Sequence, residues 1–335
     1  MTNAVVIGID PHKASHTAVA LDERELPLGD VRVRASAAQS ERLLGWARQW
    51  PQRSWAIENA AGLGYLLAQQ LVAAGERVVD VQPKLAARVR LLATAASSKS
   101  DPNDARSVAV VALRSPGLPL VTVEDHVAVM KVWIRRRRQL SRLRTRVANQ
   151  LHSVLCELVP GGFAREITAP QAAVLLESLQ AGTAADVARV QLAGEILDDL
   201  RRVDEQLREV HKRLTAVVLA SKTSLTAIFG VGPVIAAMVL AITGDVTRFP
   251  TADHFAAYAG TAPIEASSGP HKIFRLSRCG NRQLNHAIHM AAVTQIRNRH
   301  SEGRTYYERK IAEGKTQRWR YERSNAGSRP PSTTP

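Results

Sequence analysis

The first 113 residues alternate between short apolar runs and longer stretches with helical periodicity. The short runs are rich in β-branched residues and are bounded by turn residues, which is the pattern of strands. They read AVVIGID, HTAVALDE and DVRVRAS, then SWAIEN and RVVDVQP, with amphipathic helical stretches over residues 38–50 and 62–74 between them. We therefore expect five strands in this region, with helices between the later ones.

The order of these elements predicts a mixed α/β sheet. Three strands follow one another directly, and helices and strands alternate afterwards. This order is the one expected of an RNase H-like domain of the RuvC type, which we assign to residues 1–120.

The strand pattern stops in residues 121–222. Residues 127–158 read as one long helix that is intensely basic, with no acid between Asp125 and Glu157. Further along, Leu200, Val203 and Leu207 open a series of apolar residues at three- and four-residue spacing, which is typical of a coiled-coil seam. Two long helices predict an antiparallel hairpin or an oligomerisation arm.

Residues 223–323 predict a third, mostly α-helical domain. The stretch LTAIFGVGPVIAAMVLAITGD places two glycines and a proline between apolar helical segments. It is similar to a helix-hairpin-helix element, whose turn amides can bind a DNA phosphate. An ordinary buried helical hairpin explains the same pattern equally well. The tail, residues 324–335, is rich in Ser, Pro and Thr and is predicted to be disordered.

Charge indicates the class of partner. The 335 residues carry 45 Lys and Arg against 30 Asp and Glu, a formal net charge of +15. Such an excess favours a polyanion, because cations that contact phosphates release condensed counterions; an arginine-rich genome is the alternative explanation. The two cysteines form neither a metal-ligand set nor a disulfide framework. No signal peptide is seen and no apolar run reaches the ~18 residues of a membrane span. We expect a soluble cytoplasmic protein with no membrane partner.

Four carboxylates stand where an RNase H-like fold would gather them. They are Asp10 after the first strand, Glu58 at the end of the fourth, and Asp101 and Asp104 in SSKSDPNDARSVAVVAL. Asp101 and Asp104 share one helix face because they are three residues apart. Together the four could hold two Mg²⁺ ions, which neutralise the charge that develops on the attacking and leaving oxygens during phosphodiester cleavage.

Each of these acids also has an ordinary structural explanation. Asp101 can be the N-cap of a helix with Pro102 at its first position, and Asp104 then favours the helix dipole. Asp10 before a proline can start a turn. Glu58 lies in an otherwise apolar strand and is harder to explain without a partner. It is the set of four that favours a metal site.

Several long segments resemble one known family. They include GIDPHKASHTAVALD, AIENAAGLGYLLAQQLVAAGERVVDVQP and KSDPNDARSVAVVAL near the start, and IFGVGPVIAAMVLAITGDVTRFP with the residues that follow it. The chain resembles the DEDD-type transposases of the insertion sequence one-ten family, relatives of the Piv DNA invertase. The resemblance implies that Asp10, Glu58, Asp101 and Asp104 form the RuvC-like metal-binding tetrad.

The segment YAGTAPIEASSGPHKIFRLSRCGNRQLNHAI is the second chemical candidate. A serine in a basic loop can attack phosphorus, although a turn serine without a catalytic role is the commoner case. The resemblance implies a nucleophilic serine that becomes covalently linked to DNA, and it places this residue at Ser268, with Ser267 as the alternative register. Ser277 is a further candidate, for which capping a turn or holding a phosphate is an alternative role. We assign no catalytic role to the histidines nearby, which are His271, His286 and His289.

Arginines form the predicted nucleic-acid contacts. Eight cations and no acids lie between Lys131 and Gln150, too widely spread round a helix for one packing face. The candidates are Arg135, Arg136, Arg137, Arg138 and Arg142 in this helix, with Arg275, Arg278 and Arg282 beside the serine segment. A solvated helix surface is the alternative. The resemblance further implies a structured guide RNA, one part pairing with target DNA and another with donor DNA.

These observations predict a DNA transposase or recombinase that uses Mg²⁺ and a covalent serine, working as a dimer or tetramer because strand exchange involves two DNA partners. Two other hypotheses stay open. One is a RuvC-like junction resolvase that cleaves with metal-activated water and forms no covalent intermediate. The other is a non-catalytic nucleic-acid-binding protein whose acids are only helix caps.

Overall fold

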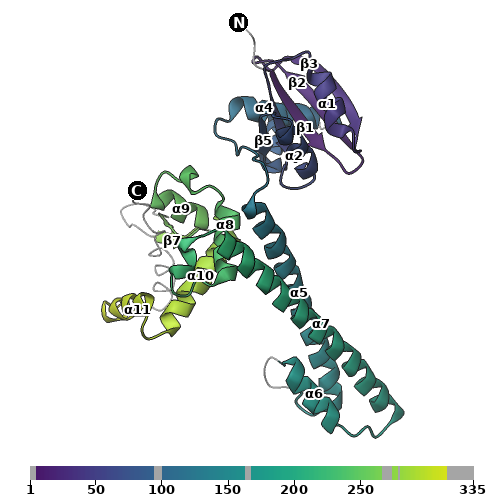
Figure 1. Ribbon diagram of the computed structural model, residues 1–335, viewed down its shortest axis with the longest axis vertical. Helices are drawn as coiled ribbons and strands as arrows, with labels where there is room; N and C mark the ends of the chain where they lie inside the picture. Colours follow the sequence, from purple (N-terminus) through teal and green to yellow (C-terminus); the bar gives the residue numbers. More distant parts are fainter. Residues whose placement is uncertain (1–4, 94–99, 163–166, 266–273, 278–279, 315–335) are drawn as a thin grey trace. The chain divides into compact units, whose positions relative to one another are not determined.

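The computed structural model describes residues 5–93, 100–162, 167–265, 274–277 and 280–314 (Figure 1). The chain divides into two compact units, Met1–Glu124 and Asp125–Pro335. No helix among the described residues is both long enough and apolar enough to cross a bilayer.

Unit 1 contains a five-stranded sheet. Its strands are β1 (Val5–Pro11), β2 (Ser15–Leu21), β3 (Pro27–Arg34), β4 (Arg53–Glu58) and β5 (Val78–Val81), in the order β3-β2-β1-β4-β5. Strand β2 is antiparallel to both neighbours, whereas β4 and β5 run parallel to β1. The predicted mixed α/β sheet is confirmed, with the strand order and directions of an RNase H-like domain.

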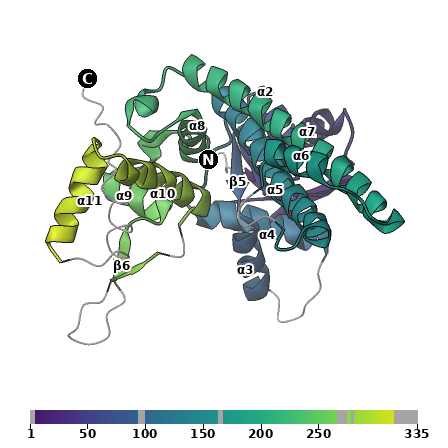
Figure 2. The same ribbon diagram turned by 90° about the horizontal axis from the view of Figure 1, so that it is seen from below.

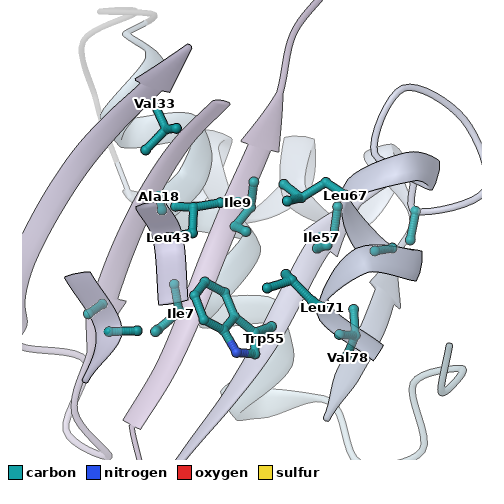
Figure 3. Close-up of a cluster of buried hydrophobic side chains, with 14 of the residues drawn as sticks. Ile7, Ile9, Ala18, Val33, Leu43, Trp55, Ile57, Leu67, Leu71 and Val78 are labelled. Atoms are coloured by element: carbon teal, nitrogen blue, oxygen red, sulfur yellow. The ribbon is translucent and has the colours of Figure 1, made fainter. Parts of the chain in front are cut away.

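Helices cover both faces of this sheet. On one face, α1 (Gln39–Ala47) and α2 (Tyr65–Ala73) pack over alternate residues of the central strands (Figure 3). This core contains Ile7, Ile9, Leu43, Trp55, Ile57, Leu67 and Leu71. On the other face, α3 (Pro83–Ala93) and α4 (Asp101–Arg114) cover the intervening residues, such as Val6 and Val19. Because side chains alternate along a strand, burial on both faces explains why the central strands are apolar at nearly every position.

Gly8 allows α4 to lie directly on β1. A Cβ atom at Gly8 would come within 2.2 Å of the Ala105 carbonyl oxygen and 2.5 Å of the Ala109 nitrogen. These are backbone atoms of α4, so any side chain at this position would push the helix away from the strand. The missing side chain therefore sets the distance between β1 and the helix that carries Asp101 and Asp104.

Unit 2 begins with a helical hairpin. It consists of α5 (His126–Leu158) and α7 (Ala184–Ala220), and the short α6 (Ala169–Ser178) belongs to the segment of chain that connects them (Figure 1). Met130 and Leu140 of α5 pack with Val210 and Leu214 of α7. Farther along α5, Val147 to Leu155 pack with Ala193 to Leu200. Since numbering rises along α5 while it falls along α7, the helices are antiparallel. The predicted hairpin is thus observed; its use as an oligomerisation arm stays a prediction.

The rest of unit 2 is mostly helical. Its elements are η1 (Ser224–Ala227), α8 (Pro233–Thr243), η2 (Val246–Arg248), α9 (Ala252–Ala259), β6 (Pro263–Glu265), β7 (Phe274–Leu276), α10 (Arg282–Arg297) and α11 (Glu302–Ala312). Helix α8 packs against α5, α7 and α10 (Figure 2). The turn that contains Gly230 and Gly232 follows the four-residue 3₁₀ helix η1 rather than an α-helix. Gln295 of α10 donates a hydrogen bond to the Phe229 carbonyl oxygen in this turn, at 2.8 Å. The helix-hairpin-helix interpretation stays a prediction.

Candidate metal centre

The four predicted carboxylates lie at one edge of the unit 1 sheet. Asp10 and Glu58 each follow the last register pair, Ile9 with Ile57, of the parallel strands β1 and β4. Parallel strands end at the same edge, so these two side chains are neighbours. Both project toward the face covered by α4, because they continue the alternation of Val6 and Ala56. Asp101 and Asp104 occupy the first turn of α4. We call these four residues the acidic cluster.

Interactions join the members of the acidic cluster directly. The carboxyl groups of Glu58 and Asp10 interact, which raises the pKa of Glu58 and lowers that of Asp10. Asp10 also experiences the charges of Asp104 and Asp101. Its Oδ2 atom is buried and accepts no hydrogen bond within the described part of the chain. A buried carboxylate oxygen without a hydrogen-bond donor is costly unless a cation balances it.

The electrostatics of the acidic cluster oppose its full ionisation. Burial raises the pKa of Asp10, and Asp104 and Asp101 raise it further, whereas His12 lowers it. Burial likewise raises the pKa of Glu58, with added repulsion from Asp10 and partial relief from Arg90. Like charges that share a buried site disfavour ionisation. Divalent cations between these carboxylates would remove the repulsion, so the residues fit a metal site of hard oxygen donors.

His12 is a residue that the sequence patterns did not single out. Its Nδ1 atom lies 3.5 Å from Asp10 Oδ2. One ligand atom from each of Asp10, His12 and Asp101 lies within 4.8 Å of the others. The only sequence signal that His12 could be a metal ligand was its position two residues after Asp10, in the turn after β1. An imidazole adds a nitrogen ligand to the oxygen donors.

The structure contradicts the register of the capping alternative. The N-cap of α4 is Ser100, in extended conformation, and Asp101 is the first helical residue instead. The Asp104 side chain is buried and lies 2.8 Å from Arg90 Nη1. Both acids lie in the first turn of α4, so the favourable interaction with the helix dipole is kept.

A tight turn after β4 orients Glu58. Asn59 has a φ of 51°, and its nitrogen donates to the Val81 carbonyl oxygen at 2.9 Å. The Ala60 nitrogen donates to Asp80 Oδ1 at 2.7 Å. Burial raises the pKa of Asp80, and the hydrogen bond from Ala60 partly offsets this. These contacts tie the residues after Glu58 to β5, so its side chain is held at the sheet edge.

In unit 2, the predicted arginines of α5 differ from the cations of α7 in their partners. Arg135, Arg136, Arg138 and Arg142 are exposed and Arg137 is half-buried. No ion pair to an acid is found for these five among the described residues, although Arg136 donates to Gln206 Oε1 at 3.1 Å. The cations Arg201, Arg202, Arg208 and Lys212 of α7 each pair with an acid three residues earlier. The positive charge of α5 is therefore the less neutralised.

An open groove of about 600 Å³ lies between α5 and α7. It is lined by Arg137, Ser141, Arg144, Thr145, Leu207, Arg208, His211 and Lys212. Four of these, Leu207, Arg208, His211 and Lys212, come from α7, and none of the four was a candidate nucleic-acid contact in the sequence. Only the pairing of the two helices brings them beside the arginines of α5.

The serine segment lies largely outside the described residues. Ser268, its neighbour Ser267, Arg278 and His271 are among the residues that the structure does not describe. Of its flanks, Glu265 of β6 pairs with Phe274 of β7. Arg275 on β7 and Arg282 at the start of α10 are exposed, as predicted contacts to a polyanion require.

Two family models match the chain. A DEDD transposase model of the IS110 group matches residues 7–160, and the model described as "Transposase IS116/IS110/IS902 family" matches residues 222–308. Together they span most of both units.

Individual relatives agree with these matches. The 44.8 kDa protein of insertion element IS116 from Streptomyces clavuligerus is 27% identical over 354 residues, which cover 92% of this chain and 88% of that protein. The 43.6 kDa protein of insertion element IS110 from Streptomyces coelicolor is 42% identical over 125 residues, 36% of this chain and 30% of that protein. A Pseudomonas aeruginosa protein named "Probable family 20 transposase" is 28% identical over 71% of this chain and 69% of its own length.

Among solved structures, the chain is similar to RuvC of T. thermophilus in complex with a Holliday junction substrate. The sequence identity is 20% and the TM-score is 0.29, covering 35% of this chain and 99% of that one.

Proposed function

Because the chain belongs to the IS110 family of transposases, we propose that it cuts and rejoins DNA strands of an insertion sequence with divalent metal ions held by the acidic cluster. The observation that carries this proposal is the gathering of four carboxylates at one edge of the sheet, where the buried Asp10 Oδ2 atom accepts no hydrogen bond from the described residues. The four acids come from β1, β4 and α4, and Asp10 and Asp104 among them are buried, so their mutual repulsion is costly unless cations balance it.

The acidic cluster fits two Mg²⁺ ions better than a softer metal, because its donors are carboxylate oxygens. When bound, such ions would supply neutralisation of the charge on the attacking and leaving oxygens. The residues of the chain hold this site in shape. Gly8 lets α4 lie close to β1, and the turn after Glu58 fixes that carboxylate at the sheet edge. His12 is positioned to contribute a ligand or to hold the Asp10 carboxylate.

Ser268 is the proposed nucleophile of unit 2, supported by the resemblance to this family. Its hydroxyl oxygen would attack the scissile phosphorus, forming a phosphodiester bond to DNA as the bond to the leaving 3′ or 5′ oxygen breaks and that oxygen takes up a proton. Arg275 and Arg282 would stabilise the negative charge of the transition state.

We expect Ser268→Ala to abolish a protein-DNA adduct that survives denaturation. A plasmid carrying the insertion element with its flanking DNA would be incubated with the protein, any RNA that copurifies with it, and Mg²⁺. Adducts would then be measured on a denaturing gel. Ser267→Ala is the matched control and should keep the adduct. Cleavage by the unaltered protein without any adduct would favour the junction-resolvase alternative instead.

A guide RNA and self-association complete the proposal. Structured RNA would occupy basic surface of unit 2, and two or more copies would hold the donor and target DNA together. Sequencing of RNA that copurifies with the full chain tests the first point; recovery of no specific RNA, with activity that persists without RNA, contradicts it. Light scattering with and without DNA tests the second.

The α5 arginines should govern the salt dependence of nucleic-acid binding. We expect Arg142→Ala to reduce the slope of log K against log salt concentration by about one, because one phosphate contact releases about one counterion. Fluorescence anisotropy with a short DNA duplex and a structured RNA would measure it. Arg201→Ala is the matched control on α7, since Arg201 is paired with Asp198 at 3.0 Å and should change the slope less. Equal slopes for both variants would argue that α5 is only a solvated surface.

A further inference from the structure

The guanidinium of Arg90 lies against the acidic cluster. Arg90 belongs to α3, a helix that carries none of the four carboxylates. Its Nη1 atom is 2.8 Å from Asp104 Oδ1, and its charge also lowers the pKa of Glu58. One arginine therefore acts on two of the four acids, from the neighbouring helix.

The contact between Arg90 and Asp104 is an ion pair whose two side chains differ in exposure. Asp104 Oδ1 is buried and accepts no hydrogen bond from the described residues, although the guanidinium nitrogen is close. The Asp104 side chain is 7% exposed, whereas that of Arg90 is 30% exposed. The carboxylate is thus fixed inside the site, while the guanidinium has access to solvent. The contact is between two opposite charges, so a metal cation that binds Asp104 would compete with the guanidinium for the same carboxylate.

Arg32 provides a comparison at the same site. Its Nη2 atom lies 3.5 Å from Asp101 Oδ2, but its side chain is 67% exposed. Its Nε atom also donates to Ser15 Oγ at 3.1 Å, which holds the side chain on the strand surface. Solvent screens such an exposed pair strongly. Arg90 is therefore the cation with the greater influence on the acidic cluster.

We propose that Arg90 is a built-in counter-ion of the acidic cluster, which competes with a divalent cation for Asp104 and so sets the metal concentration at which the site fills. The inference rests on the proposed function in one respect, namely that the acidic cluster binds metal. A divalent ion that takes Asp104 as a ligand meets the positive guanidinium at the same carboxylate and must displace it. If Arg90 competes with the metal, its removal makes metal binding tighter. If Arg90 only orients Asp104, its removal makes metal binding weaker.

The test is a Mn²⁺ titration of the full chain, first treated with chelator, by isothermal calorimetry. We expect Arg90→Gln to bind Mn²⁺ about tenfold more tightly than the unaltered protein, and Arg90→Lys to stay close to it, because lysine keeps the charge. Arg114→Gln is the matched control. It removes an ion pair between α4 and Glu25 that involves none of the four acids, and should leave the affinity unchanged.

Two further measurements distinguish competition from other roles. In chelator, Arg90→Gln should unfold at a lower temperature than the unaltered protein, because the carboxylates repel one another, and Mn²⁺ should raise its midpoint by the larger amount. In strand cleavage, the Mn²⁺ concentration for half-maximal rate should be lower for Arg90→Gln than for the unaltered protein.

Unchanged or weaker Mn²⁺ binding by Arg90→Gln would overturn the proposal. A lower maximal rate with an unmoved Mn²⁺ midpoint would also overturn it and would assign Arg90 to the substrate. If neither the unaltered protein nor Asp10→Asn takes up Mn²⁺, the proposal that the acidic cluster binds metal is refuted, and the proposed competition is refuted with it. If Mn²⁺ uptake is abolished in Asp10→Asn but is the same in Arg90→Gln as in the unaltered protein, the metal site stands and only the competition by Arg90 is refuted.

Discussion

Replacement of Asp10 by asparagine should reduce metal-dependent strand cleavage by about a thousandfold or more, because the central negative ligand of a phosphoryl-transfer site is lost. The same variant should be more stable than the unaltered protein in chelator. Burial raises the pKa of Asp10, so the folded state disfavours the charge that asparagine lacks. Cleavage of plasmid DNA and thermal unfolding would be measured on the same preparations.

Asp30→Asn is the matched control for this prediction. Asp30 is an exposed acid on β3 of the same sheet, so the substitution removes a charge without touching the acidic cluster. We expect its activity and stability to stay unchanged. Recombination that persists in Asp10→Asn would contradict the metal mechanism and support the hypothesis of a non-catalytic nucleic-acid-binding protein.

Gly8→Ala should destabilise unit 1 by about 3 kcal/mol and disrupt metal binding with it. The added methyl group would lie 2.2 Å from the Ala105 carbonyl oxygen, and the backbone of α4 cannot yield as a flexible side chain would. The helix must then move away from β1 and carry Asp101 and Asp104 away from Asp10. Urea unfolding followed by circular dichroism would give the free energy of unfolding. Calorimetry with Mn²⁺ would measure the affinity of the acidic cluster for metal.

Gly45→Ala is the opposite case in the same unit. Gly45 lies within α1, and no described atom outside the backbone of its own helix lies within 4 Å of the place a Cβ atom would take. Alanine should therefore stabilise the protein by about 0.5–1 kcal/mol through its higher helix propensity. If Gly8→Ala is tolerated as well as Gly45→Ala, the close approach of α4 to β1 does not determine the site.

Local patterns predicted much of unit 1. The apolar runs that end at Asp10 and Glu58 are strands, and their order gave the mixed sheet. Glu58 could be selected because a carboxylate in an otherwise apolar strand is unusual, whereas Asp101 and Asp104 were selected as part of the set of four and by the family resemblance. The long basic helix and the apolar seam of α7 likewise predicted the hairpin, since their periodicity reports one packed face.

Other features had no local signal. His12 looks like a turn residue, and Arg90 looks like one more arginine in a basic chain. The groove residues Arg208 and Lys212 each have an acid three positions earlier, so they resemble ordinary solvated helix charges. The proximity of Arg90 to Asp104, and of Arg208 and Lys212 to Arg137, depends on contacts between different helices.

The sequence by itself determined which residues form strands and helices, and which carboxylates and arginines are available for chemistry, because periodicity and residue type act over a few neighbouring positions. Only the tertiary structure decided that α4 lies on β1 at Gly8, that Asp104 is buried beside Arg90, and that one buried Asp10 oxygen accepts no hydrogen bond from the described residues. These facts depend on how closely separate backbones pack, and that distance is set by the whole core rather than by any single stretch of the chain.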